Sequence, residues 1–220
     1  MKISAQTIQI LKNFASINPS ILITPGSKLS TITPTARSVK ADAKVEEDFP
    51  QECAIYNLYQ FLAAISLFEN PDFDFRDNCV VISSGNQHVE FRYASKDLIE
   101  YPPNKKITLP SVDVQFTMTS SLYQNVMKAL GILQLSEIAV QGDESGIYVA
   151  TVDSVNVSGN SYKVRVAEPN GHTFNLIYRA ANLKFMPQDY QVQISSRGFS
   201  LFDGGDLQYW VALEGKSKFD

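Results

Sequence analysis

Residue types that commonly perform catalysis or hold metal ions are few and scattered in this chain. His88 and His172 lie far apart, and Cys53 and Cys79 do not have the spacing of a zinc site. We interpret the histidines as surface or edge residues and the cysteines as small buried side chains with reduced thiols. No nucleophile is paired with a general base in a known motif. The sequence therefore predicts a protein that is not an enzyme and holds no metal ion.

Two short motifs resemble ligand-binding loops but lack a required residue. Gly215-Lys216-Ser217 has the end of a phosphate-binding loop, yet Trp210 stands where such a loop needs glycine. Asp72-Phe73-Asp74 has the start of a calcium loop, but its sixth position would be Asp77 where glycine is required. We therefore predict no bound nucleotide, metal or other cofactor.

The composition describes a chain that can form two domains. It has 220 residues, of which 44% are hydrophobic and 11% aromatic, enough for two domains of about 100–110 residues. The formal net charge is −4 at pH 7, unlike the basic balance of most DNA-binding domains. The first residues form no apolar signal core, and no apolar run is long enough to span a membrane. We therefore expect a soluble cytoplasmic protein without membrane contact.

Apolar periodicity predicts four helices, and most of the remaining chain has the alternation of strands. The helices are expected at residues 4–17, 57–68, 119–133 and 179–186. Prolines end three of them, at Pro19, Pro71 and Pro187. The clearest strands are expected at residues 89–93, 162–166 and 190–194.

The order of these elements repeats. Leu11-Lys12 aligns with Met127-Lys128 at an offset of 116 residues. Each copy has a helix, several strands, a second helix and several more strands, with a proline-containing segment between the copies. We predict an α+β protein of two similar domains, residues 1–100 and 111–220, joined by a linker at 101–110.

The charges are distributed unevenly. The four predicted helices contain Lys12, Lys128, Arg179 and Lys184 but none of the 23 acidic residues. Acidic residues normally favour helix N-termini and exposed helix faces, so their absence needs a reason. One interpretation is the low charge density of the chain, 19%. The other is that the helices face a polyanion, with acidic residues such as 46–48 on the opposite surface, since a few cations attract phosphates without reading bases.

Five segments, in the same order along the chain, carry a resemblance to one protein family. They are Leu11–Asn18; Ala54–Leu58 with Phe61-Leu62 and Ser66-Leu67; Pro103–Lys105 with Ile107 and Pro110; Phe174-Asn175 with Ala181-Asn182, Lys184 and Pro187; and Val211–Glu214. In these segments the chain resembles the DNA polymerase sliding clamps of T-even-type bacteriophages. The resemblance implies a DNA-clamp (PCNA-like) fold. Three subunits would join head to tail in a ring, with helices lining the hole and antiparallel sheets outside.

The resemblance also implies roles for particular residues. The DNA-facing residues would be Lys12, Lys128, Arg179 and Lys184. A pocket near the domain junction would bind the C-terminal peptide of the replicative polymerase and would be lined by Ile107, Leu109, Val211 and Leu213. Edge strands would join the subunits, and we expect these contacts from Val89, Phe91 and Tyr93 on one edge and from Tyr162, Val164 and Val166 on the other.

The implied function is that of a processivity factor, which encircles duplex DNA as a homotrimer and tethers the polymerase in the infected bacterial cell. An ATP-driven clamp loader would open or assemble the ring, and binding of late-transcription factors stays open. One alternative is a β-rich phage structural protein of the tail or baseplate without a DNA role, which would not account for acid-free helices. Another is a hydrolase with scattered catalytic groups, for which the sequence has no positive signal.

Overall fold

The computed structural model describes residues 1–105, 107–156 and 158–220. Contacts divide the chain into two compact units, Met1–Asn104 and Lys105–Asp220. The division falls within the segment 101–110 that the sequence predicts as a linker. The described residues of that segment form neither helix nor strand.

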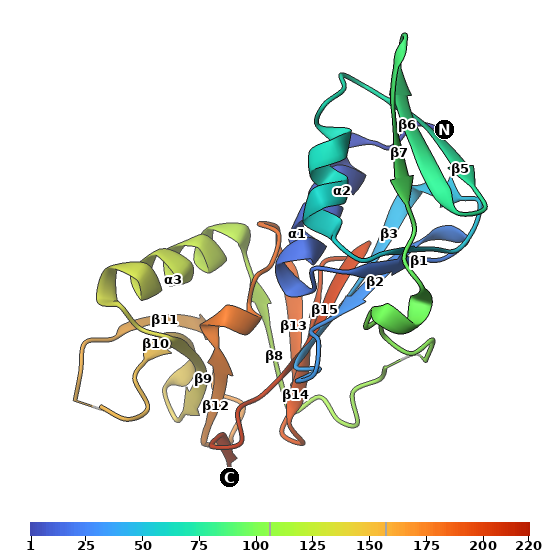
Figure 1. The fold of residues 1–220 in the computed structure, drawn as a ribbon. Coiled ribbons are helices and arrows are strands. Elements are labelled where there is room, and N and C mark those ends of the chain that lie inside the picture. The colour runs from blue at the N-terminus through green and yellow to red at the C-terminus, as the bar shows by residue number, and fades with distance from the viewer. Residues whose placement is uncertain (106, 157) are drawn as a thin grey trace. The chain divides into compact units, whose positions relative to one another are not determined.

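The first unit contains two α-helices, seven strands and one short 3-10 helix. In chain order these are α1 (Ala5–Ile17), β1 (Ile21–Ile23), β2 (Gly26–Ile32), β3 (Val39–Phe49), β4 (Cys53–Ile55), α2 (Leu58–Ile65), β5 (Asp72–Arg76), β6 (Cys79–Ser84), β7 (Gln87–Arg92) and η1 (Lys96–Leu98). Strand β1 pairs with β4, β2 pairs with β3, and β5, β6 and β7 form a sheet in that order. All of these pairs are antiparallel. In Figure 1, α1 and α2 lie side by side in this unit, and contacts between the two helices agree with the view.

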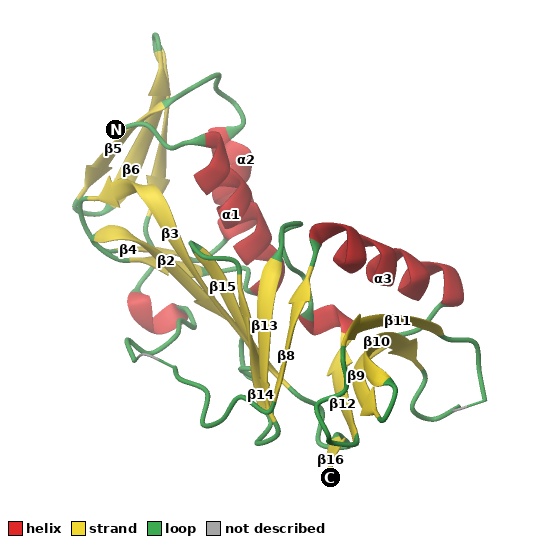
Figure 2. Cartoon of the chain, turned by 180° about the vertical axis from the view of Figure 1, so that it is seen from behind, coloured by secondary structure: helices red, strands yellow, loops and turns green. Residues whose placement is uncertain are grey.

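The second unit contains one long α-helix among nine described strands and a 3-10 turn. In chain order these are β8 (Val114–Met118), α3 (Ser120–Leu133), β9 (Glu137–Asp143), β10 (Gly146–Val152), β11 (Tyr162–Ala167), β12 (Phe174–Arg179), η2 (Ala180–Asn182), β13 (Tyr190–Ser195), β14 (Phe199–Asp203), β15 (Leu207–Ala212) and β16 (Lys218–Phe219). One sheet has the order β11-β10-β9-β12-β16, and the other strands follow the order β15-β14-β13-β8. Figure 2 shows α3 along one face of the sheet that contains β9, β10 and β11.

The predicted repeat is visible in the order of the elements. In each unit a helix leads into four strands, of which the first pairs with the fourth and the second with the third. A short helical segment and a three-stranded antiparallel run follow. Strand β8, which pairs with β13, also has a counterpart: Met1 exchanges backbone hydrogen bonds of 2.7 and 2.8 Å with Phe73 on β5. Both units therefore have the same plan.

Helix α1 begins and ends where the sequence predicts. The Ser4 hydroxyl accepts a hydrogen bond from the Thr7 N–H at 3.2 Å, as an N-cap residue does. Asn18 follows the last turn, and its buried side-chain amide donates to the carbonyls of Ile32 and Glu100 at 3.0 and 2.9 Å. The residue before Pro19 therefore ends the helix and also anchors its end to the rest of the unit.

The second predicted helix is shorter than expected. Helix α2 ends at Ile65, and the chain then turns through Ser66, whose hydroxyl donates to the Ala63 carbonyl at 2.7 Å. Phe68, which the periodicity placed on the buried side of a longer helix, is only half-buried in the following turn. A serine that bonds to the preceding turn competes with helix continuation, which explains the early end.

The fourth predicted helix, 179–186, is wrong. Arg179 is the last residue of β12, and only Ala180–Asn182 form a single 3-10 turn. In residues 183–186, backbone groups form hydrogen bonds with tyrosine hydroxyls. The Tyr123 hydroxyl donates to the Leu183 carbonyl at 2.7 Å and accepts from the Phe185 N–H at 3.1 Å, and the Tyr209 hydroxyl accepts from the Met186 N–H at 3.2 Å.

The side chain of Phe185 explains why this segment is not helical. Its ring centroid lies 4.5 Å from that of Tyr209 and 4.7 Å from that of Phe202. Leu183 and Phe185 are buried while Lys184 between them is exposed, which is the alternation of an extended chain. Packing of these aromatic rings in the core of the second unit therefore overrides the weak helical preference of the sequence.

Candidate nucleic-acid interface and subunit edges

Lys12 lies on the exposed face of α1. Gln6 and Gln9 are exposed on the same side, while Leu11 and Phe14 on the other side are completely buried. The exposed residues recur every three positions, so they form one polar stripe along the helix. A duplex that approached this face would meet amides and one cation.

Lys128 occupies the equivalent place on α3. Gln124 and Asn125 are exposed near it, while Val126 and Leu130 are buried against the sheet. Leu122 and Leu133, which the sequence places on the buried side, are half-buried. The three α-helices contain Lys12 and Lys128 as their only charged residues.

The other two predicted DNA-facing residues are not on helices. Arg179 ends β12, and its Nε lies 3.1 Å from a carboxylate oxygen of Glu214, which offsets its charge. Lys184 is exposed in the extended segment after η2. The prediction of four basic residues on four helices is therefore corrected to two basic residues on three α-helices, with Arg179 and Lys184 on neighbouring segments of the second unit.

The N-termini of α1 and α3 have acidic partners from other parts of the chain. The Ser4 N–H donates to one oxygen of Glu47 on β3, and the Thr7 hydroxyl donates to the other, both at 2.5 Å. Burial of Glu47 would raise the pKa of its carboxyl group, but the hydrogen bonds from Thr7 and Ser4 outweigh burial and lower it. In the second unit, the Ser120 N–H at the start of α3 donates to Asp189 at 2.7 Å.

These contacts correct one expectation and explain another. Residues 46–48 were predicted to lie on an acidic outer surface, but Glu47 is buried at the start of α1, while Glu46 and Asp48 are exposed. A negative charge near a helix N-terminus is stabilising because it complements the helix dipole. Glu47 and Asp189 supply that charge from outside the helix sequences, so α1 and α3 have acidic partners while their exposed faces carry none.

The residues predicted to join subunits lie on sheet edges. Strand β7 is the outer strand of β5-β6-β7, and β11 is the outer strand of β11-β10-β9-β12-β16. On β7, Val89 and Phe91 are half-buried, and Tyr93 directly follows the strand in the same state. On β11, the half-buried residues are Tyr162, Val164 and Val166. Among the described residues each strand has one hydrogen-bonded neighbour, which leaves a row of backbone groups available for pairing.

Of the residues predicted to line a peptide pocket, three are accessible and one is not. Ile107 and Leu109 are half-buried in the extended segment before β8, and Leu213 is half-buried just after β15. Val211, by contrast, is completely buried in β15, where its carbonyl accepts a hydrogen bond from the Ser200 hydroxyl at 3.2 Å. Val211 is therefore a core residue, because alternation along the strand turns its side chain inward.

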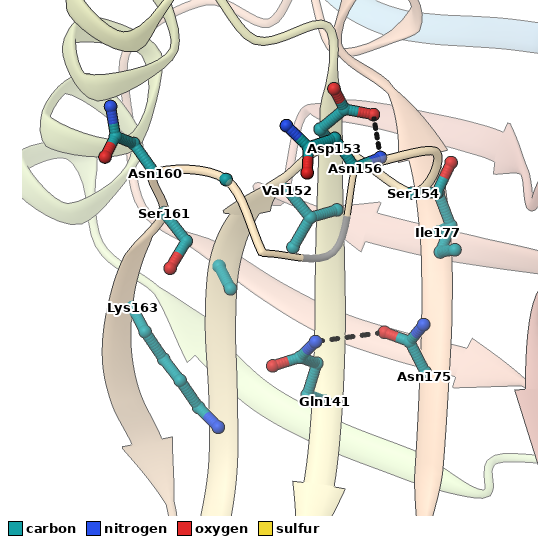
Figure 3. A pocket seen from close by; sticks show the side chains of 12 residues that line it. Gln141, Val152, Asp153, Ser154, Asn156, Asn160, Ser161, Lys163, Asn175 and Ile177 are labelled. Atoms are coloured by element: carbon teal, nitrogen blue, oxygen red, sulfur yellow. Dashed lines mark hydrogen bonds between the residues drawn. The ribbon is translucent and has the colours of Figure 1, made fainter.

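A polar pocket that the sequence did not reveal lies on the sheet of the second unit, beside residues 153–156 and 159–161. Its volume is about 210 Å³. Figure 3 shows Gln141 and Asn175 on neighbouring strands, joined by a 3.2 Å hydrogen bond, and Lys163 on β11 at the side of the pocket. Asp153 accepts hydrogen bonds from the backbone N–H groups of Val155 and Asn156 at 2.8 and 3.1 Å, which folds the loop beside the pocket.

Comparison with known proteins decides the family. A family model described as gp45 sliding clamp, C terminal, matches residues 115–215. The chain is 33% identical to the sliding clamp of Vibrio phage KVP40 over 97% of its own length and 99% of that protein. It is 28% identical to the sliding clamp of Enterobacteria phage T4, with both chains covered in full. This chain belongs to the sliding-clamp family.

Solved clamp structures share its fold. The structure of A. fulgidus PCNA bound to the C-terminal region of FEN-1 matches with a TM-score of 0.68 at 10% identity, covering 96% of each chain. The Helicobacter pylori beta clamp bound to a DNA ligase peptide matches with a TM-score of 0.68 at 14% identity, covering 97% of this chain and 65% of that one. The predicted α+β clamp fold with antiparallel sheets is therefore confirmed.

Other features of this sliding clamp concern its reactive and apolar groups. Burial raises the pKa of the Cys53 thiol to about 12, so the thiol stays protonated at neutral pH. Cys53 and Cys79 are both buried and free. Within residues 1–105, 107–156 and 158–220, no group of three or more histidine, cysteine or acidic side chains is arranged to hold a metal ion. In the same residues, no helix is long and apolar enough to cross a membrane.

Proposed function

We propose that this sliding clamp is a non-enzymatic processivity factor that works as a closed ring of three identical chains joined head to tail. The ring encircles duplex DNA without sequence preference and holds the replicative polymerase on its template. The observation that carries the proposal is the charge pattern of α1 and α3: their exposed faces have amides and a lysine each, while the acidic groups at their N-termini are Glu47 and Asp189 from outside the helices.

The DNA-facing surface in this proposal contains Lys12, Lys128, Arg179 and Lys184. Lys12 and Lys128 extend from exposed helix faces, and Arg179 contributes less because Glu214 is its partner. Few cations give weak, salt-sensitive attraction to phosphates. Such attraction suits a ring that must stay linked to DNA and still slide along it.

Closure of the ring uses the two sheet edges. A head-to-tail contact forms a closed ring when the rotation between neighbours fits. Pairing of β7 from one chain with β11 from the next would bury the apolar side of both edges and satisfy their backbone groups. The interface residues are Val89, Phe91 and Tyr93 on one side and Tyr162, Val164 and Val166 on the other.

The two domains are residues 1–100 and 111–220, joined by a linker at 101–110. Partners bind as short peptides beside this linker. The candidate contacts are Ile107, Leu109 and Leu213, which are partly exposed and apolar. Two solved clamp structures support this mode: A. fulgidus PCNA is bound to the C-terminal region of FEN-1, and the H. pylori beta clamp to a DNA ligase peptide. For this chain the peptide would be the C-terminus of the replicative polymerase. An ATP-driven clamp loader and late-transcription factors are further proposed partners in the cytoplasm of an infected bacterium.

The test combines solution mass with DNA retention. Light scattering should give three times the chain mass of 24.5 kDa. After loading by clamp loader and ATP, the protein should stay on circular DNA and leave the same DNA once a nuclease has made it linear. Primed-circle synthesis should then become processive. A protein that is monomeric at all concentrations and never extends the product length would contradict the proposal, and stable incorporation into virions would favour a structural role.

A further inference from the structure

The edge strands β7 and β11 each have one apolar side, which faces the helices, and one charged side. On β7, the Phe91 ring faces the helix layer and lies 5.1 Å from the Phe61 ring of α2, while His88, Glu90 and Arg92 are exposed on the other side. On β11, Tyr162 borders a cavity with Lys128 and Ile132 of α3, and Lys163 and Arg165 are exposed on the other side. When β7 of one copy pairs with β11 of another and the helices of both lie on the same side, the apolar residues of the two strands meet on the helix side. Their charged residues meet on the other side.

Charge prevents β11 from pairing with a second β11. Its outer side carries the cations Lys163 and Arg165, so two copies would place like charges across from one another. Strand β7 offers an acid, Glu90, between His88 and Arg92. The edge that complements β11 is therefore β7 of another copy. Every strand pair within the two sheets concerned is antiparallel, and continuation of the sheets keeps that direction.

Alternation of the side chains restricts the register to steps of two residues. When Phe91 is opposite Tyr162, Glu90 is opposite Lys163 and Arg92 is opposite Ser161. This register pairs two aromatic rings on the helix side and opposite charges on the outer side.

The register with Phe91 opposite Asn160 places Glu90 opposite Ser161 and Lys163 opposite His88, so it forms no pair of opposite charges. The two registers displaced in the other direction bring like charges together. When Phe91 is opposite Val164, Glu90 meets Arg165, but Arg92 meets Lys163. When Phe91 is opposite Val166, Arg92 meets Arg165. Like charges directly across an antiparallel pair are destabilising, so both alternatives are disfavoured.

The ion pairs within the chain favour the same choice. The carboxylate of Glu90 lies 3.6 Å from Arg92, and the ammonium of Lys163 lies 3.9 Å from Asp143, both beyond ordinary hydrogen-bond distance. Arg165, by contrast, lies 2.7 Å from Glu168, at hydrogen-bond distance. Glu90 and Lys163 therefore keep more hydrogen-bonding capacity for a new partner than Arg165 does, and the Lys163 ammonium also lies 4.0 Å from the centroid of the Tyr148 ring. Figure 3 shows Lys163 on β11, on the face of the sheet that bears the polar pocket.

We propose that adjacent subunits join in one register, with β7 antiparallel to β11 and Glu90 directly opposite Lys163 of the neighbouring copy. The pair selects the register, while the like charges of Lys163 and Arg165 prevent β11 from pairing with itself. This inference rests on the proposed ring, because it describes the joint by which that ring closes.

Paired cysteines test the register directly. Residues directly opposite in an antiparallel pair have Cα atoms about 4.5–5.5 Å apart, within disulfide range, whereas diagonal residues are about 7–8 Å apart. The full chain carrying Glu90→Cys with Lys163→Cys should form covalent trimers under mild oxidation. The matched variant, Glu90→Cys with Arg165→Cys, should do so at least about tenfold more slowly, since its Cα atoms exceed that range. The wild-type chain controls for the buried Cys53 and Cys79.

Charge reversal tests the role of the pair. Glu90→Lys or Lys163→Glu alone should raise the concentration at which the trimer dissociates by about fivefold or more per interface, because attraction becomes repulsion. The combination of the two should restore the wild-type value. Glu90→Lys with Arg165→Glu should not restore it, although its net charge change is the same.

The outcomes separate this proposal from that of the ring. A trimeric protein in which the 90–165 pair cross-links faster than the 90–163 pair overturns the register alone. Efficient cross-linking of Glu90→Cys by itself would show β7 paired with β7 and also overturn the register. A wild-type protein that stays monomeric in light scattering overturns the ring, and the register with it.

Discussion

At the scale of single residues, Glu47 connects the sheet of the first unit to the start of α1. Both carboxylate oxygens accept hydrogen bonds, from the Ser4 N–H and from the Thr7 hydroxyl. Hydrogen bonds to a charged acceptor are stronger than neutral ones. One buried acid on β3 thus completes the N-terminus of a helix from which it is separated by about 40 residues.

We expect Glu47→Gln to lower the free energy of unfolding at pH 7 by about 1–3 kcal/mol, because the neutral amide has one oxygen that accepts a single hydrogen bond more weakly, and its NH2 group cannot accept the other. The pKa of Glu47 is lowered in the folded state, so its stabilising effect is present above the ordinary value of 4.5 and is lost as the pH falls through the folded value. Urea unfolding at pH 7 and pH 4 should show a smaller difference between variant and wild type at pH 4.

Glu46→Gln is the matched control for this prediction, since Glu46 is exposed on the same strand. It should change the stability by no more than about 0.5 kcal/mol. Equal losses in the two variants at pH 7 would contradict a special role for Glu47.

The lysines on the helices should determine the salt dependence of DNA binding. Lys12→Gln and Lys128→Gln should each weaken DNA association and reduce the slope of log affinity against log salt by about 0.9 for each phosphate that the variant no longer neutralises. Light scattering should still give the wild-type mass, because both lysines lie on exposed helix faces. Lys44→Gln, on the exposed side of β3, is the control. An unchanged slope in the Lys12 and Lys128 variants would remove these residues from the DNA-facing surface.

At the scale of elements, the segment after β12 depends on tyrosine hydroxyls. Tyr123→Phe removes the group that donates to Leu183 and accepts from Phe185. We expect a loss of about 1–3 kcal/mol in the stability of the second unit, since buried backbone groups lose a partner. Tyr59→Phe, on an exposed position of α2, should have little effect in the same urea titration. Similar stability of the two variants would contradict this account.

Local signals explain which elements the sequence could predict. Ser4 and Thr119 cap the helices α1 and α3, and Asn18 before a proline ends α1, so these helices are found from chain-neighbouring residues alone. The non-helical segment at 183–186 depends on Tyr123 and Tyr209, which are distant in sequence. For the same reason the sequence placed Lys12 and Lys128 on helices correctly but placed Arg179 and Lys184 on a helix that does not form.

At the scale of the whole molecule, the structure separates core residues from surface residues of the same type. Val211 and Leu213 are both apolar residues near the end of β15, but only Leu213 is partly exposed. The resemblance to the clamp family assigned both to the peptide pocket, and the sequence did not show that β15 ends at Ala212, between the two residues. Their separate roles can be measured.

Leu213→Ala should weaken binding of the polymerase C-terminal peptide while changing the stability by less than about 1 kcal/mol. Val211→Ala should instead lower the stability by about 1–3 kcal/mol, because it leaves a cavity in the core. Calorimetric titration of the peptide and urea unfolding of each variant measure the two effects. Peptide binding that is unaffected by Leu213→Ala would place the pocket elsewhere.

The carboxylates that complete α1 and α3 have a consequence for how such a protein can change. Since Glu47 and Asp189 come from outside the helices, the charge that each helix needs is independent of the residues on its exposed face. We therefore expect substitutions at exposed positions such as Gln9 and Gln124 to change the surface that faces DNA in the proposed ring while the helix N-termini keep their acidic partners. In the proposed ring, the residues that face DNA and the carboxylates that stabilise α1 and α3 are therefore different residues, so a substitution in one set leaves the other unchanged.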